Sequence, residues 1–351
     1  MMRIRLGVAI GLVILFTFVT VAFATYTTQE LLNGGITKVK VAIINEFTTG
    51  QWQVQYISGV RSMLTEAGIP QANIFMTDAQ FNRAKMVSDL ETALSKNVDI
   101  ILINHGAAEG LRPLIEKAVK KGIVVVTVDL KLDMPEVIET NQDDYLLAYY
   151  SLIHLIEDFG GNANIAVVWV GGFTPMEKRQ KILNLLLGEF PGIKVVATYG
   201  NATDNTVGDT MQRTLAVLKA HPTIDAFWAS WDQFAQGVYK ALMQTGKKIP
   251  IYSIDVSPED IAMMRAKGSP WVATAASDPY ELGRIDVRLA LMKLVGEKVP
   301  PFYIHPAAYI TQNMVRKLPE GQYLSKKYVP TWGESGKFWP DWLEQLAGKQ
   351  D

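Results

Sequence analysis

The sequence contains no cysteine among its 351 residues. Disulfide bridges, thiolate nucleophiles and thiolate metal ligands are therefore excluded, and so is a lipoprotein anchor, which requires an acylated cysteine. Net charge is nearly absent as well, since 34 Lys and Arg residues stand against 35 Asp and Glu residues. Because a balanced chain has no overall field that attracts nucleic acid, we expect no nucleic-acid partner.

Motifs of the common enzyme classes are also missing. There is no Gly-x-Ser-x-Gly nucleophile elbow, and the four histidines show no metal-ligand spacing. The turn at residues 45–52 has neither dinucleotide glycine spacing nor the lysine of a phosphate-binding loop. We therefore predict a protein that catalyses no reaction and that binds neither a metal nor a cofactor.

The N-terminal residues carry the pattern of an export signal. An uncharged run follows Arg3 and Arg5 and closes on the small-x-small sequence Ala22-Phe23-Ala24. We predict a signal peptide at residues 1–24 and a polar spacer at residues 25–37. The run approaches the roughly 20 apolar residues of a spanning helix, so an uncleaved membrane anchor is the alternative. In both cases the rest of the chain is expected in the periplasm or outside the cell.

From residue 38 onward, short apolar runs alternate with stretches of helical periodicity. Continuous Ile and Val runs at 99–104 and 123–129 indicate strands that are buried on both faces. The alternation restarts near residue 143, so the pattern predicts an α/β fold with two doubly wound parallel-sheet lobes. Residues 321–351 are rich in Tyr, Trp, Pro and Gly and have no strong period. We expect them to form a C-terminal extension that packs over one lobe.

Polar and aromatic residues recur just after the predicted strands. In open parallel sheets, ligands bind beyond the carboxyl ends of the strands, where loops diverge and helix N-termini present free N–H groups. Carboxylate, amide and guanidinium groups satisfy ligand hydroxyls, and indole rings stack on the C–H face of a sugar. The candidate ligand-binding residues are Trp52, Gln53, Asn104, Asp129, Arg179, Thr203, Trp231, Asp255, Ser277 and Asp278.

Each of these residue types also has a purely structural interpretation. An Asp at a strand end often caps the following helix, and a Trp in an α/β fold often packs in the core. Arg179 stands beside Glu177, Lys178 and Lys181, a composition that also suits a solvated helix face.

Four stretches together resemble a known family, namely 100–104 (IILIN), 124–129 (VVVTVD), 221–226 (HPTIDA) and 273–283 (ATAASDPYELG). Over residues 38–315 the chain resembles the ribose-type periplasmic sugar-binding proteins, the type I solute-binding proteins of ABC transporters. The resemblance implies two lobes joined by a three-segment hinge. The crossings are expected near 141–142, 276–278 and 304–306. The implied lobes are 38–141 with 278–305, and 142–277 with 306–320.

The family's ligand positions can be carried over one at a time. Its aromatic pair in the first turn looks like Trp52 and Gln53, and its strand-end Asn and Asp fall on Asn104 and Asp129. Its helical Arg in the second lobe falls on Arg179, and its late Asp falls on Asp255.

Three positions depart from the family pattern. The Arg that follows the strand-end Asp is Leu130 here, an Asn of the second lobe is Trp231, and a Gln near the hinge is Ser277. These departures indicate a ligand with fewer hydroxyls, a larger apolar face or a cationic group.

The resemblance implies a monomer that closes two lobes over a sugar or sugar-like ligand and delivers it to an ABC transporter permease. The same fold also serves sensing modules that present the bound state to a chemoreceptor or histidine kinase, and this alternative stays open. A cytoplasmic repressor with the same core is disfavoured, because an export signal stands where a helix-turn-helix would be.

Overall fold

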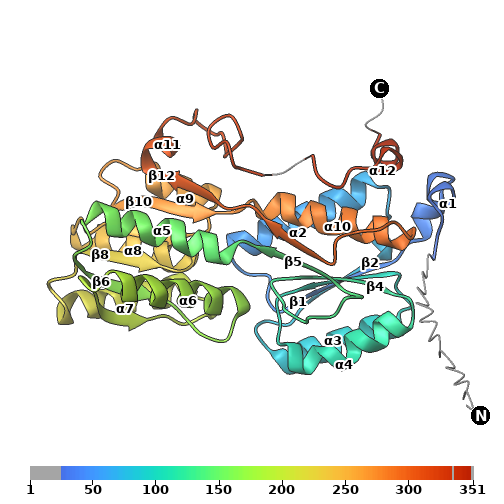
Figure 1. The fold of residues 1–351 in the computed structure, drawn as a ribbon, viewed down its shortest axis with the longest axis horizontal. Helices are drawn as coiled ribbons and strands as arrows, with labels where there is room; N and C mark the ends of the chain where they lie inside the picture. Colours follow the sequence, from blue (N-terminus) through green and yellow to red (C-terminus); the bar gives the residue numbers. More distant parts are fainter. Residues whose placement is uncertain (1–24, 334–335, 349–351) are drawn as a thin grey trace, which may run out of the picture.

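The computed structural model describes residues 25–333 and 336–348, which form two α/β lobes lying side by side (Figure 1). Each lobe is built on one six-stranded sheet. The predicted signal peptide at residues 1–24 lies outside the described residues. Within the described ranges, no helix is both long enough and apolar enough to cross a membrane.

The first lobe contains a fully parallel sheet of strand order β11-β5-β4-β3-β1-β2. Its strands are β1 Val41–Asn45, β2 Ile74–Asp78, β3 Ile100–Asn104, β4 Val124–Val128, β5 Ile138–Gln142 and β11 Phe302–His305. Its helices are α1 Thr28–Leu32, α2 Gln51–Glu66, α3 Arg83–Ser95, α4 Ala108–Lys120, α10 Pro279–Leu294 and α12 Asp341–Leu346, with short 3-10 helices at Gly35–Lys38 and Gln71–Asn73. Val41 and Ile43 belong to the apolar core shared with α2 and α10, whereas Ala42 and Ile44 belong to the core shared with α3 and α4. Burial on both faces explains the continuous apolar runs.

The second lobe repeats the arrangement with strand order β12-β10-β9-β8-β6-β7. Its strands are β6 Ala163–Val168, β7 Ile193–Tyr199, β8 Ala226–Ala229, β9 Ile251–Ile254, β10 Trp271–Ala276 and β12 Ala308–Thr311. Its helices are α5 Asp144–Asp158, α6 Thr174–Glu189, α7 Thr206–Ala220, α8 Asp232–Thr245, α9 Pro258–Arg265 and α11 Gln312–Arg316. Only the edge strand β12 runs antiparallel to its neighbour, β10, among the described ladders.

The chain crosses between the lobes three times, which confirms the predicted three-segment hinge. β5 of the first sheet leads into α5, which packs on β9 and β10 of the second lobe. β10 of the second sheet leads into α10, which packs on α2 of the first lobe. The third crossing joins β11 to β12.

Close packing of α2 on α10 depends on two glycines. A Cβ at Gly59 would lie 1.9 Å from the carbonyl oxygen of Tyr280, and one at Gly283 would lie 2.3 Å from the carbonyl oxygen of Tyr56. Because both contacts are with backbone atoms, no side chain fits at either position. The two helix backbones therefore touch, and this contact fixes the position of α2, whose first turn reaches the space between the lobes.

The C-terminal segment covers both lobes, and the expectation that it packs over one lobe was wrong. Leu324, Val329 and Trp332 are buried in the core of the second lobe. Leu343 in α12 is buried in the core of the first lobe, and Trp342 donates a hydrogen bond to Glu297. Figure 1 shows the segment running past both lobes to end beside α1. Its spaced apolar side chains find partners on each lobe, so it has no single helical period.

Candidate ligand-binding site

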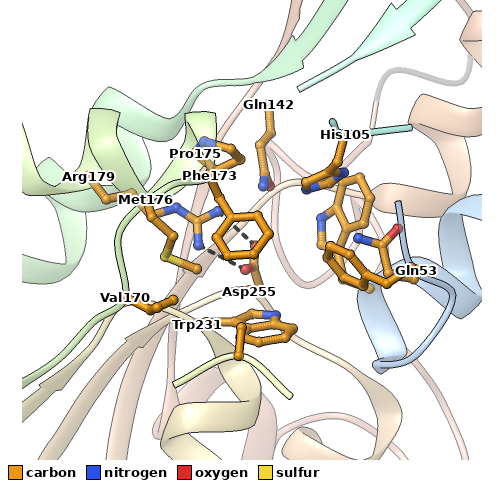
Figure 2. Close-up of a pocket in the computed structure, with 13 residues that line it drawn as sticks. Gln53, His105, Gln142, Val170, Phe173, Pro175, Met176, Arg179, Trp231 and Asp255 are labelled. Carbon is orange, nitrogen blue, oxygen red and sulfur yellow. Dashed lines mark hydrogen bonds and ion pairs between the residues drawn. The ribbon is translucent and has the colours of Figure 1, made fainter. Parts of the chain in front are cut away.

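A cavity lies between the two lobes, beyond the carboxyl ends of strands from both sheets. It holds about 440 Å³ of empty space, part of it open to solvent. Figure 2 shows side chains from both lobes arranged around the same space. The lining residues are Phe47, Trp52, Gln53, His105, Gln142, Val170, Phe173, Pro175, Met176, Arg179, Ala202, Trp231 and Asp255.

Three residues that directly follow strands have left-handed backbone conformations. His105 follows β3 with φ of 63°, Asp129 follows β4 with φ of 53°, and Asp255 follows β9 with φ of 70°. Asp and His tolerate this region better than most residues, but it remains strained relative to extended backbone. Such strain gathers at binding sites because it turns a strand-end side chain toward a ligand.

The polar wall of the second lobe is an ion-pair network centred on Arg179 in α6. Nε of Arg179 donates to Asp144 Oδ1 at 3.0 Å, and Nη1 donates to Asp255 Oδ2 at 3.1 Å and to the Ser230 carbonyl oxygen at 2.5 Å. All three side chains in these ion pairs are buried. Burial raises the pKa of Asp255, opposed by the neighbouring guanidinium. The network holds Arg179 and Asp255 rigidly at the cavity wall.

Gln142, the last residue of β5, links this network to the hinge. Its amide is oriented by its neighbours, so that the oxygen accepts from Arg179 Nη2 at 2.8 Å and the nitrogen donates to Asp255 Oδ1 at 3.2 Å. Gln142 therefore couples the first crossing between the lobes to the polar wall. It was not among the predicted site residues, although a crossing was expected at 141–142.

In the first lobe, the amide of Asn104 is fully used by protein groups. Its Nδ2 donates to Asn45 Oδ1 at 3.1 Å and to Gln53 Oε1 at 2.7 Å, and its Oδ1 lies 2.6 Å from Nδ1 of His105. Asn104 is buried and does not line the cavity, whereas Gln53 and His105 do. Asn104 therefore orients the two side chains that meet the cavity.

Asp129 lies behind the cavity wall, with its carboxylate 4.0 Å from Nε2 of His105. It is buried, and neither carboxylate oxygen has a hydrogen-bond partner in the described part of the chain. Burial, with a contribution from the charge of Asp144, raises the pKa of Asp129 well above its usual range. A carboxyl group in this state takes up a proton more readily than an exposed one, so it accepts hydrogen bonds when ionised and donates one when protonated.

The remaining wall is apolar and largely aromatic. It is formed by Phe47, Val170, Phe173, Met176 and the two indoles, Trp52 and Trp231. The ring of Phe47 in the first lobe lies 6.1 Å from that of Phe173 and 6.4 Å from that of Trp231 in the second lobe. These contacts join the lobes at the cavity, whose lining combines polar side chains with apolar and aromatic ones.

Polar contacts also bridge the lobes beside the cavity. Arg83 in α3 donates from Nη2 to the carbonyl oxygen of Gly172 at 2.6 Å, and it pairs with the buried Glu46 at 3.2 Å. Gln55 in α2 donates to the carbonyl oxygen of Val256 at 3.3 Å. With the aromatic contacts, these bonds hold the lobes together over the cavity.

Three predicted residues lie away from the cavity. Thr203 closes a turn, its hydroxyl accepting from the backbone of Asn205, and the neighbouring Ala202 lines the cavity instead. Ser277 is buried in the hinge, and Asp278 caps α10 by accepting from the backbone N–H of Glu281. Asp278 therefore caps a helix, which is the structural interpretation of a strand-end Asp. None of the described His, Asp and Glu residues forms a cluster that could hold a metal ion.

A buried carboxyl group supports the aromatic wall from behind. Tyr56 stacks on Trp52 with ring centroids 5.5 Å apart, and its hydroxyl donates to Asp286 Oδ2 at 2.7 Å. Burial raises the pKa of Asp286 from 3.8 to about 7, even though the hydrogen bond from Tyr56 lowers it. Asp286 therefore destabilises the fold increasingly as the pH rises from about 4 to about 7, because only the unfolded chain ionises freely there.

We expect Asp286→Asn to remove much of this pH dependence. An asparagine oxygen still accepts from Tyr56, so the variant should match the parent protein near pH 4 and exceed its stability at pH 8. A pKa shift of this size corresponds to a gain in the free energy of unfolding on the order of 2–4 kcal/mol at pH 8. Urea unfolding of both proteins at pH 4 and pH 8 measures this gain. If the variant and the parent protein differ in stability equally at both pH values, the raised pKa of Asp286 is wrong.

A two-lobed α/β protein with a hinge of three segments, and with a cavity between its lobes, is a solute-binding protein by architecture. Residues 41–298 match the family model described as periplasmic binding protein domain. The chain belongs to this family, whose members bind solutes outside the cytoplasm.

Solved structures and curated relatives agree with this assignment. The 5-methylthioribose transporter solute-binding protein of Thermotoga lettingae, solved with 5-methylthioribose, is 38% identical with a TM-score of 0.84, covering 90% of this chain and 100% of its own. A sugar ABC transporter protein of Yersinia enterocolitica is 34% identical with a TM-score of 0.85, covering 89% and 95%. The ribose import binding protein of Bacillus subtilis is 26% identical over 73% of this chain and 83% of its own length.

Proposed function

We propose that this protein captures a sugar that carries an apolar substituent, of the 5-methylthioribose type, and delivers it to an ABC transporter permease. It acts outside the cytoplasm as a monomeric receptor and catalyses no reaction. The observation that carries the proposal is the combination, in the lining of one cavity, of hydrogen-bonding side chains with a set of apolar and aromatic ones. The similarity to the Thermotoga protein supports it.

The polar wall accounts for the sugar part of the ligand. Arg179, Asp255 and Gln142 from one side, with Gln53, His105 and the underlying Asp129 from the other, supply both donors and acceptors. Each sugar hydroxyl both donates and accepts, so such a mixed wall satisfies it.

The apolar wall accounts for the substituent. Val170, Phe173 and Met176 present hydrocarbon, an aromatic face and a thioether, and none of them hydrogen-bonds to a hydroxyl through its side chain as a carboxylate does. Burying a methylthio group against them contributes about 1–2 kcal/mol. The site therefore prefers the substituted sugar to ribose by about tenfold or more.

Thermal unfolding and tryptophan fluorescence with a panel of ligands test the proposal. With 5-methylthioribose at about 100 times its Kd, ligand binding stabilises the protein by about 2.7 kcal/mol and raises the melting temperature. Ribose, xylitol, allose and a small quaternary amine complete the panel. Ribose binding as tightly as 5-methylthioribose would refute the substituted sugar, and a response to the amine alone would refute the sugar class.

A matched pair of variants tests which side chains contact the apolar substituent of the ligand. We expect Phe173→Ala to weaken 5-methylthioribose binding more than ribose binding, because the ring contacts the apolar part only. Phe75→Ala removes an aromatic ring from β2 that does not line the cavity, and it should change neither affinity.

A further inference from the structure

A directed chain of hydrogen bonds runs from the backbone of β2 to the cavity. It begins at the carbonyl oxygen of Thr77, which can only accept. Asn45 must therefore turn its Nδ2 toward this oxygen, at 2.8 Å, and its Oδ1 toward Asn104. Each amide has one donor end and one acceptor end, so the first link sets the direction of those that follow.

The same rule carries the direction through Asn104 to His105. Because Asn45 presents an oxygen, Asn104 donates from Nδ2, and because Nδ2 is used there, Oδ1 faces the His105 ring. An oxygen facing Nδ1 at 2.6 Å requires Nδ1 to carry the proton. Gln53 Oε1, which also accepts from Asn104 Nδ2 at 2.7 Å, agrees with this orientation.

The His105 ring is held in this arrangement. It is buried, and its centroid lies 5.3 Å from that of Phe47 and 5.6 Å from the Trp52 ring, edge to face. Burial, with the charges of Arg179 and Lys178, lowers the pKa of His105 to about 3, so the ring is neutral at pH 7. The 4.0 Å contact between Nε2 and Asp129 is therefore not an ion pair, and it is too long for a hydrogen bond, so Nε2 keeps its acceptor capacity.

We infer that His105 is a specificity-determining residue whose Nε2 accepts a hydrogen bond from a ligand hydroxyl. Of the two groups in this contact, the cavity lining presents Nε2 of His105, because Asp129 lies behind it. A ligand that presents a carbonyl, an ether or a hydrogen at this position leaves Nε2 unpaired and is rejected. The inference deepens the proposed function, on which the choice of probe rests.

Nitrogen-15 NMR of the ligand-free protein tests this series of hydrogen bonds without any ligand. In long-range proton–nitrogen spectra at pH 7, we expect a pyridine-like shift for Nε2 of His105 and a pyrrole-like shift for Nδ1. The signals are assigned by their loss in His105→Phe. A proton on Nε2, or a doubly protonated ring, overturns the inference whatever the protein binds.

Binding measurements that combine the His105→Phe variant with deoxy forms of the ligand test the contact between Nε2 and a ligand hydroxyl. His105→Phe keeps a planar ring but has no acceptor, and it should lower the affinity for 5-methylthioribose by 10-fold to 100-fold. The parent protein should prefer 5-methylthioribose to one of its 1-, 2- and 3-deoxy forms by at least 10-fold, and His105→Phe should not. If every hydroxyl keeps its parental preference in His105→Phe, the inference is wrong.

The control is His154→Phe, at a half-exposed histidine that stacks on Tyr309 far from the lining residues, and it should leave all these preferences unchanged. If 5-methylthioribose does not bind the parent protein, the proposed function fails, while the proton position on His105 still decides the inference.

Discussion

Replacing Arg179 with Met should abolish detectable sugar binding and lower the free energy of unfolding by about 3–5 kcal/mol. The guanidinium is 1% exposed and serves Asp144, Asp255 and the Ser230 carbonyl group at once. Its removal leaves a buried Asp255 without its cation, and breaking a buried pair costs far more than the pair's net contribution to stability. Urea unfolding and titration calorimetry with 5-methylthioribose measure the two losses.

The stability loss and the binding loss at Arg179 can be separated. Adding Asp255→Asn to Arg179→Met removes the uncompensated charge, so stability should recover in part while binding stays lost. Arg213→Met is the surface control, because Arg213 forms an exposed pair with Asp209 one turn away in α7. Arg213→Met should lower the free energy of unfolding by less than about 1 kcal/mol. Normal binding by folded Arg179→Met would contradict the proposed site.

Asp129→Asn should change stability and binding in opposite directions. In the described residues both carboxylate oxygens are buried without partners, and burying a charge without hydrogen bonds is costly, whereas an amide carries no charge. We therefore expect the ligand-free variant to melt a few degrees higher at pH 7. Asparagine replaces one carboxyl oxygen beside Nε2 of His105 by an N–H donor, and an unmatched buried hydrogen-bonding group costs about 1–3 kcal/mol, so sugar affinity should fall by 10-fold to 100-fold.

The pH dependence gives this prediction a second readout. The pKa of Asp129 is raised in the folded protein, so its unfavourable effect is absent below the unfolded pKa and grows as the pH rises above about 4. The gain in melting temperature should accordingly shrink toward pH 4. Asp286→Asn serves as a matched control, because it should show the same pH trend with unchanged sugar affinity. Equal loss of binding in both variants would point to a general disturbance of the first lobe.

Most of the architecture could be predicted because buried parallel strands leave an unmistakable pattern. Runs such as β3 and β4 are apolar at every position or nearly so, since helices cover both faces of the sheet. β5 was missed, because its sequence Ile-Glu-Thr-Asn-Gln is mostly polar although all five residues are buried. β2, at Ile74–Asp78, lies at a sheet edge where burial is incomplete, so it lacks such a continuous apolar run.

The strand-end rule selected part of the candidate site. Five residues predicted by it line the cavity, namely Trp52, Gln53, Arg179, Trp231 and Asp255. Phe47, two residues beyond β1, satisfies the same rule and was overlooked among the first-turn residues, and Phe173 follows the glycine pair after β6 in the same way. The rule selects loops rather than side chains, because a strand-end residue can equally cap a helix or close a turn, as Asp278 and Thr203 do.

The sequence by itself determined the α/β fold, because hydrophobic periodicity is a local property of the chain, and the resemblance of four stretches to a known family indicated the class of protein. Only the tertiary structure decided which polar groups line the cavity. Whether Asn104 faces the cavity or orients His105 depends on partners 51 and 59 residues away, and the proton on His105 follows from a carbonyl group on another strand. Such assignments arise from hydrogen bonds between distant segments, and no local pattern encodes their direction.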